Sequence, residues 1–234
     1  AYAKTFNRKN LKSMKKRILV ISPHPDDETL ALGGSIAKFI DKGSEVKILT
    51  ISGHLPPLYD RNDYETTVKE AKEAYKILGV KEFKFLEIPA TMVKDEPVHK
   101  LNGLISSNIQ EFNPEMVLIP FPDRHIDHRV IFDSCMVATR PVGKGKQIKM
   151  LAAYETLSET HWNAPYIEMN FNPNLVVDVS NYIEIKVSAL ERFKSQISKS
   201  GPRSTEAIRA LAKFRGSQSG FEYGEALYII RKVL

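Results

Sequence analysis

Histidines and carboxylates concentrate in two short stretches of the sequence, and each stretch directly follows an apolar segment. The first is residues 23–28 (PHPDDE) and the second is residues 125–128 (HIDH). Imidazole nitrogens and carboxylate oxygens are ligands that zinc takes in proteins, and a zinc site with three protein ligands keeps one position open for chemistry. The two stretches therefore predict a catalytic metal centre, beside which a carboxylate outside the ligand set can act as a general base.

Within the first stretch, His24 and Asp27 can point at one centre as an imidazole and a carboxylate, which leaves Asp26 beside the metal as the base. A simpler interpretation is that the three acids only open a helix, because the first turn of a helix favours negative charge. That interpretation gives no reason for a histidine between two prolines. We therefore favour the metal centre.

In the second stretch, His125 and His128 lie three residues apart and share one face if a helix starts there. Asp127 points elsewhere and can reach back to a ring nitrogen. A pair of histidines at this spacing is common and is weak support by itself. The support becomes stronger because both stretches follow predicted strands, whose carboxyl ends meet at one edge of a parallel sheet.

These stretches resemble the two signatures of a known family. Residues 23–28 resemble the signature of the zinc-dependent sugar N-deacetylases of the PIG-L and LmbE-like superfamily, and residues 125–128 resemble its second signature, His-x-x-His ending in Asp-His. The order of the signatures and their separation of about a hundred residues are also similar to the family. The resemblance runs from about Lys15 to the C-terminus.

The resemblance implies a Zn²⁺-dependent hydrolase that removes the N-acetyl group from a GlcNAc-type amino sugar, including phosphorylated or nucleotide-linked ones, and releases acetate. The implied zinc ligands are His24, Asp27 and His128. The implied catalytic residues are Asp26 as general base and His125, which Asp127 orients and keeps charged, as the group that stabilises the oxyanion.

The substrate side departs from the family pattern. Many members carry an arginine three residues before a glutamate that corresponds to Glu70, and this chain has Thr67 there, so that Arg61 or Lys69 would have to substitute. A later family segment that ends in His-x-Ser-Gln has Phe193 in place of the histidine. The candidate substrate contacts are Arg61, Arg124, Trp162 and Tyr223, with Tyr166 as a second aromatic on which a sugar could stack.

The elements that must position these residues follow from the apolar pattern. Apolar runs predict strands at 18–21, 46–51, 83–88 and 116–119, and helices with one apolar face alternate with them. Further strands are expected at 151–154 and 175–179, with an irregular region at 155–174 between them. This alternation predicts a Rossmann-like α/β fold, namely a doubly wound, mainly parallel sheet in a single domain. The first strand is not followed by G-x-G-x-x-G, so we expect no dinucleotide cofactor.

Composition is that of an ordinary globular protein, with 234 residues of which 42% are hydrophobic and 26% charged. The single cysteine, Cys135, excludes an internal disulfide framework and is typical of a reducing compartment, so we expect a cytoplasmic protein. We expect no membrane span, because no apolar stretch reaches the required length.

The net charge of +6 is concentrated at one end of the chain. Residues 1–17 hold seven basic residues and no acid, which leaves 27 basic against 28 acidic residues in the remainder. The body is therefore not basic, and we do not expect a nucleic-acid partner. We interpret residues 1–13 as a basic N-terminal extension or a cloning remnant, and residues 14–234 as the LmbE-like deacetylase domain.

Other functions remain open at this stage. Related proteins suggest a metal-dependent amidase that acts on a thiol-cofactor conjugate of the mycothiol or bacillithiol type. A non-catalytic sugar-nucleotide-binding protein with a structural metal is a second alternative, and a nucleic-acid module based on residues 1–17 is the weakest. The expected partner is a small N-acetyl sugar substrate. The resemblance also implies a homo-oligomer, because relatives are often trimers or hexamers.

Overall fold

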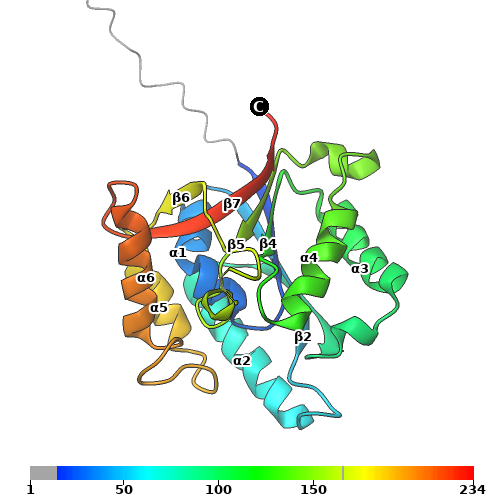
Figure 1. Ribbon diagram of the computed structural model, residues 1–234, viewed down its shortest axis with the longest axis horizontal. Helices are drawn as coiled ribbons and strands as arrows, with labels where there is room; N and C mark the ends of the chain where they lie inside the picture. Colours follow the sequence, from blue (N-terminus) through cyan, green and yellow to red (C-terminus); the bar gives the residue numbers. More distant parts are fainter. Residues whose placement is uncertain (1–14, 165) are drawn as a thin grey trace, which may run out of the picture.

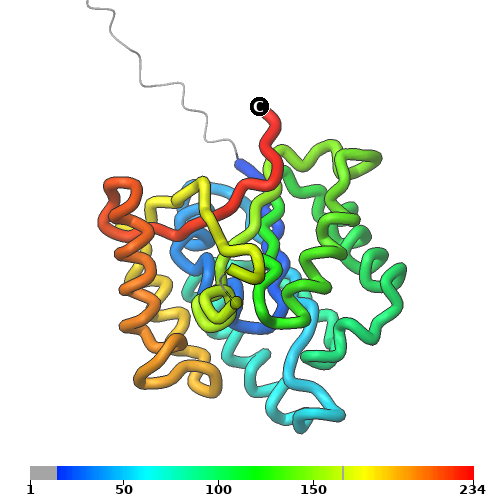
Figure 2. The backbone as a smooth tube through the Cα atoms, viewed as in Figure 1, coloured from blue at the N-terminus to red at the C-terminus, as the bar shows by residue number. Residues whose placement is uncertain are grey.

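A computed structural model describes residues 15–164 and 166–234 (Figures 1 and 2). The strands are β1 (Arg17–Ser22), β2 (Glu45–Gly53), β3 (Glu82–Pro89), β4 (Met116–Pro120), β5 (Met150–Tyr154), β6 (Leu175–Asp178) and β7 (Gly224–Lys232). The α-helices are α1 (Asp27–Asp41), α2 (Arg61–Leu78), α3 (Val98–Phe112), α4 (Ile126–Ala138), α5 (Ile183–Leu190) and α6 (Thr205–Ser217). Short 3₁₀ helices are η2 (Val93–Asp95), η3 (Gly143–Gln147) and η4 (Thr160–Trp162). The predicted extension, residues 1–13, lies outside the described residues.

The strands form one seven-stranded sheet in the order β3-β2-β1-β4-β5-β7-β6. Strands β1 to β5 pair in parallel, whereas β7 runs antiparallel to both β5 and β6. The chain winds outward from β1 to β3 and then returns to β4 on the other side of β1. This reversal confirms the predicted doubly wound, mainly parallel α/β sheet.

Helices cover both faces of the sheet. Helices α1, α2, α5 and α6 lie on one side of it, and α3 and α4 lie on the other (Figures 1 and 2). Strand β1 supplies both cores, because Val20 packs in the cluster that contains Leu32, while Leu19 packs in the cluster that contains Ile105. A strand buried on both faces has a continuous apolar sequence, which is the pattern from which it was predicted.

Helix α1 packs closely against its neighbours because two glycines leave room for them. A Cβ atom added to Gly33 would lie 2.9 Å from Cγ of Lys186 on α5, and one added to Gly34 would lie 2.9 Å from Cβ of Val179. Any side chain at either position would push α1 outward. These contacts set the position of the middle of α1, the helix that begins at Asp27, relative to α5 and Val179.

Helix α6 and strand β7 were not predicted from the apolar pattern. Strand β7 inserts between β5 and β6, and its Glu225 is buried. The Glu225 carboxylate accepts hydrogen bonds from the backbone N–H groups of Gly34 (2.9 Å) and Ser35 (2.6 Å) and pairs with Nζ of Lys186 (2.6 Å). The C-terminal strand thereby fixes α1 from a second direction.

None of the helices in the part of the chain that the structure describes is both long and apolar enough to cross a membrane.

Candidate metal centre

The two polar stretches meet at the carboxyl end of the sheet. Strands β1 and β4 are hydrogen-bonded parallel neighbours, with Leu19 paired to Val117, so the turns that follow them leave the same edge. Helix α1 begins at Asp27, and His125 is the N-cap residue of α4. The approach of the two stretches, predicted from strand order, is confirmed by this pairing.

His24, Asp27 and His128 place one ligand atom each within 4.8 Å of one another. Oδ2 of Asp27 lies 3.0 Å from Nδ1 of His24 and 3.3 Å from Nε2 of His128. Neighbouring ligand atoms of a tetrahedral zinc site with bonds of about 2.0 Å are roughly 3.3 Å apart, so the spacing fits zinc. Nε2 of His128 and Oδ1 of Asp27 are buried without a hydrogen-bond partner among the described residues. Buried polar atoms are rarely left unpaired, and a cation bound by Nε2 of His128 and the Asp27 carboxylate would give both groups a partner.

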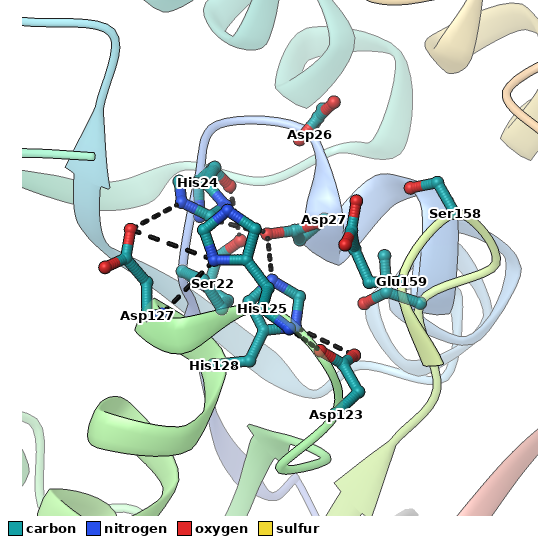
Figure 3. A network of polar contacts seen from close by, with 12 residues as sticks. Ser22, His24, Asp26, Asp27, Asp123, His125, Asp127, His128, Ser158 and Glu159 are labelled. Carbon is teal, nitrogen blue, oxygen red and sulfur yellow. Dashed lines mark hydrogen bonds and ion pairs between the residues drawn. The ribbon is translucent and has the colours of Figure 1, made fainter. Parts of the chain in front are cut away.

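Each histidine of this triad has a carboxylate on its other ring nitrogen (Figure 3). Nε2 of His24 lies 3.0 Å from Oδ2 of Asp127, and Nδ1 of His128 lies 3.0 Å from Oδ2 of Asp123. A carboxylate in this position accepts a hydrogen bond from the ring N–H and so keeps the proton on that nitrogen, which leaves the lone pair of the opposite nitrogen free for a metal. The donor set therefore fits a metal centre with both histidines in the correct tautomer.

Asp127 has a different main partner from the one we predicted. Its carboxylate lies 3.0 Å from Nε2 of His24 but 4.0 Å from Nδ1 of His125. It also accepts the backbone N–H of Thr91 at 2.7 Å. Nδ1 of His125 accepts the backbone N–H of Asp127 as the helix cap, so a neutral His125 ring carries its proton on Nε2. We expected the Asp127 carboxylate to orient His125. Nδ1 of His125 instead accepts the backbone N–H of Asp127, and the carboxylate of Asp127 lies 4.0 Å from it.

Asp26 lies beside the triad without joining it, as predicted for a general base. Its side chain is 4% exposed, and its Oδ2 pairs with Nη1 of Arg203 at 2.8 Å. Arg203 also donates to Ser158 (3.1 Å) and Gln196 (3.3 Å), so three partners hold the guanidinium in place. Glu28, the last acid of the first stretch, is not part of the centre, because its carboxylate accepts the hydroxyls of Ser22 and Thr29.

The carboxylates give the centre a strong preference for positive charge. Burial alone would lower the pKa of His24, but Asp127 and Asp27 outweigh it and raise the pKa to about 9. Burial alone would also lower the pKa of His128, but Asp27 and Asp123 outweigh it and raise the pKa to about 10. Burial alone would raise the pKa of Asp27, but the His128 and His24 rings hold it well below its usual range. A metal cation satisfies the same preference when it displaces the ring protons.

The two proposed catalytic side chains have shifted pKa values of their own. Burial raises the pKa of Asp26 against the opposing effect of Arg203, which is the direction that suits a base working near neutral pH. Burial, with the neighbouring His24 and His128 rings, lowers the pKa of His125 to about 4. His125 is therefore neutral at pH 7 and can donate one hydrogen bond from Nε2.

A pocket opens beside the triad, and it is lined by His24, Pro25, Asp26, Gly53, His54, Tyr59, Thr67, Ala90, Thr91, His125, Glu159, Gln196 and Arg203. Several of these residues had no role in the sequence analysis. Asp123 was missed as the orienting partner of His128, although its place two residues before His125 was a signal. Gln196 belongs to the family-like segment that follows Phe193, whereas nothing local marked Arg203 or Glu159.

The predicted substrate contacts are only partly near this pocket. Arg61 pairs with Glu87 of β3 (3.1 Å) and lines a separate surface groove on α2 together with Lys69, so neither replaces the missing arginine. Tyr223 lies before β7, where its backbone N–H bonds Ser180 Oγ. None of these three residues is in the lining of the pocket, so its geometry gives no support to them as substrate contacts.

Arg124 and Trp162 lie at the pocket's margin. Arg124 donates from Nη1 to Oε2 of Glu159 at 2.8 Å, and its guanidinium stands 5.6 Å from the centre of the Trp162 ring. The Trp162 side chain points largely to solvent, as does Tyr166, whose exposure is complete. The aromatic ring that does line the pocket is Tyr59, which stands 4.4 Å from the His54 ring.

Comparison with known proteins gives a family and a fold. Residues 19–139 match the family model PIG-L, described as GlcNAc-PI de-N-acetylase. The diacetylchitobiose deacetylase of Thermococcus kodakarensis is 27% identical over 229 residues, which cover 92% of this chain and 83% of that protein.

Solved structures share the fold over nearly the whole chain. A conserved protein of Thermus thermophilus superimposes with a TM-score of 0.74 at 25% identity and covers 94% of this chain and 96% of its own. The 4-carboxy-2-hydroxymuconate hydratase GalB of Pseudomonas putida reaches a TM-score of 0.76 at 18% identity, covering 94% of this chain and 98% of its own. A hydratase on this fold means that the fold alone does not decide the reaction, and the function has to be argued from the site.

Proposed function

The chain belongs to the PIG-L family, GlcNAc-PI de-N-acetylase, and we propose on that basis that it is a zinc-dependent hydrolase that removes the acetyl group from an N-acetylated amino sugar. His24, Asp27 and His128 are the proposed ligands, and Asp26 is the proposed base. The sugar class follows the relatives, among which the diacetylchitobiose deacetylase of Thermococcus kodakarensis covers 92% of this chain.

One observation carries the proposal. Nε2 of His128 is buried without a hydrogen bond from the described residues, 3.3 Å from an Asp27 carboxylate that also lies 3.0 Å from Nδ1 of His24, and the Asp26 carboxylate stands beside this triad without belonging to it. A protein that only bound a sugar nucleotide would have no need for the buried carboxylate of Asp26 at the edge of the pocket. Zinc would supply Lewis acidity here, by which it lowers the pKa of water and polarises an amide carbonyl.

The protein's own groups would divide the remaining work. Asp26, held by Arg203, accepts the proton of the attacking water. A C–O bond then forms at the acetamide carbon while the C–N bond breaks, and Asp26 returns the proton to the departing nitrogen. Nε2–H of His125 donates to the oxygen on which negative charge develops. The products are acetate and a free amino sugar.

The pocket offers the surfaces that a sugar ring uses. Tyr59 presents a partly exposed aromatic ring to the pocket, against which the C–H face of a sugar can pack. Glu159, Gln196 and Thr91 line the same space and can bond sugar hydroxyls. A cytoplasmic location and a trimeric or hexameric assembly stay predictions.

The test measures metal content by elemental mass spectrometry and acetate release from N-acetyl sugars on the same preparations. We expect about one zinc per chain in the wild type. His128→Ala should lose both metal and activity, whereas Asp26→Asn should keep the metal and lose roughly 10²-fold or more in turnover. His99→Ala is the matched control, because His99 is exposed on α3, and it should change neither quantity.

Two results would reject the proposal. One is a wild-type protein that binds no divalent metal after zinc is supplied and the excess is removed. The other is an Asp26→Asn variant with normal turnover, which would take Asp26 out of the base role. Acetate release from sugars but not from thiol-cofactor conjugates would exclude the amidase alternative.

A further inference from the structure

The charge of the pocket wall carries an inference about the substrate, and it rests on the proposed function. Beside the histidines, the charged residues that line the pocket are Asp26, Glu159 and Arg203. Arg203 is the single lysine or arginine among them, and its guanidinium is already committed to Asp26 at 2.8 Å, to Ser158 and to Gln196. Among the described residues that line the pocket, no lysine or arginine is left to meet a negative charge.

An acidic residue, Glu159, also lines the pocket, and it follows Ser158, to which Arg203 donates. The Glu159 side chain is 11% exposed, and its Oε2 accepts from Nη1 of Arg124 at 2.8 Å. Oε1 accepts no hydrogen bond from the described residues, so it stays available to a ligand in the pocket. Arg124 approaches Glu159 from outside the lining set, with its own side chain 45% exposed and close to the Trp162 ring. Within the pocket, Glu159 therefore presents a free carboxylate oxygen as an acceptor, while its cationic partner Arg124 lies outside the lining.

The α2 side of the pocket carries no charge to balance Glu159. Thr67 lines the pocket there, and its hydroxyl donates to the backbone oxygen of Asp63 at 2.8 Å. Arg61 and Lys69 on the same helix line a separate surface groove with Glu87. A ligand in the pocket thus meets a neutral surface on one side and a carboxylate on the other.

We infer that the site takes an uncharged N-acetylated sugar and discriminates against one with a phosphate or carboxylate next to the ring. A carboxylate accepts hydrogen bonds from sugar hydroxyls, and these bonds are strengthened by its charge. An anionic substituent would lose those bonds and would face the Glu159 carboxylate in a partly buried space, where the one cation of the lining, Arg203, is held by Asp26 and Arg124 stands on the far side of Glu159 from the lining. The metal would be engaged by the acetamide group and would not be free for the substituent. Phosphorylated and nucleotide-linked sugars, which the sequence left open, are then the poorer substrates.

The test compares kcat/KM for acetate release from N-acetylglucosamine and N,N′-diacetylchitobiose with that from N-acetylglucosamine 6-phosphate and N-acetylglucosamine 1-phosphate. We expect the neutral sugars to be preferred by the wild type by at least about 10-fold. Glu159→Gln keeps the shape of the side chain, removes its charge and releases Arg124. The preference should then shift toward the phosphorylated sugars by about 10-fold or more.

Glu184→Gln is the matched control. It makes the same chemical change and also releases an arginine, since Glu184 pairs with Arg209 at 2.7 Å, but this pair joins α5 to α6 and lies outside the pocket. Its preference should stay within about twofold of the wild type, so that a shift confined to Glu159→Gln reports the local charge and not the net charge of the protein.

The outcomes separate the inference from the proposed function. A wild type that prefers the phosphorylated sugars overturns the inference while deacetylation stands, as does a folded Glu159→Gln variant with unchanged preference. If Glu159→Gln does not fold, the wild-type comparison decides. If the zinc-bound protein releases acetate from none of the sugars, the proposed function is overturned and the inference with it.

Discussion

The Asp123 carboxylate decides which nitrogen of His128 faces the metal position, so its replacement tests the proposed centre at a residue that is not a ligand. Oδ2 of Asp123 accepts from Nδ1 of His128 (3.0 Å) and from Oγ1 of Thr160 (2.9 Å), and Oδ1 accepts the backbone N–H of His125 (3.0 Å). Asp123→Asn keeps the shape but turns one oxygen into an NH₂ donor. Both oxygens face donors, so the amide meets a donor in either orientation.

The size of the effect follows from the response of His128. An NH₂ group that faces Nδ1 of His128 can donate to it only if the ring proton is on Nε2. The proton then occupies the lone pair that would bind the metal. Loss of such an orienting partner weakens metal binding by about 10- to 100-fold, which corresponds to roughly 1.4–2.7 kcal/mol. The ligands themselves remain in place, so binding should be weakened and not abolished.

The assay is a competition titration of zinc against a chromophoric chelator at neutral pH, on proteins shown by circular dichroism to be folded. Asp133→Asn is the control, because Asp133 is an exposed aspartate on the same helix, α4. We expect the control to match the wild type within about twofold, and Asp123→Asn to bind about 10- to 100-fold more weakly. Equal zinc affinity in wild type and Asp123→Asn would refute the argument that this carboxylate selects the tautomer.

Three further predictions concern other parts of the structure. Arg203→Ala should lower kcat by about 10- to 100-fold, with a smaller change in KM, because Asp26 loses its 2.8 Å partner; steady-state kinetics with an unchanged kcat would contradict this positioning role. Glu155→Gln leaves Arg215 buried without its charge partner and should lower the free energy of unfolding in urea by about 3 kcal/mol at neutral pH. Burial alone would raise the pKa of Glu155, but hydrogen bonds from a neighbouring histidine and from Arg215 hold it below 4.5, so this difference should be complete above pH 4.5 and shrink as the pH falls below it. Cys135 is buried, and burial raises the pKa of its thiol, so a disulfide reagent should label it at least roughly 100-fold more slowly in the native protein than in urea; equal rates would show that it is accessible.

The order of the central strands was predictable because each one carries its own signal. Strand β1 is apolar along its length since both of its faces are buried, and a helix with one apolar face follows it. The C-terminal part of the sheet carries less information of this kind. Strand β7 pairs with β5, which lies about 75 residues earlier, and with β6. Its position between them depends on contacts such as that of Glu225 with the middle of α1, which no local pattern records.

The convergence of the three proposed ligands was predictable for a related reason, whereas the carboxylates that contact their histidines were not. His24 and His128 follow strands that are neighbours in the sheet, and parallel neighbours end at the same edge. Their orienting carboxylates, Asp127 and Asp123, lie in the second stretch or just before it, but which of them contacts which ring depends on the side-chain geometry at the start of α4. Sequence spacing favoured a contact between Asp127 and His125, and the N-cap hydrogen bond at Nδ1 of His125 takes that position instead.

The substrate wall is built from segments that are far from both signatures, and this separation has a chemical consequence. Arg203 and Gln196 come from the segment between α5 and α6, and Glu159 comes from the segment after β5. Thr67 stands where the family resemblance implies an arginine, and the cation that lines the pocket is Arg203, which already pairs with Asp26. A change in these segments can alter the charge that the pocket accepts without moving any of the three proposed ligands. The same metal chemistry can therefore serve neutral and anionic sugars in different relatives, and in this chain the identity of residue 67 and the carboxylate of Glu159 both favour the neutral one.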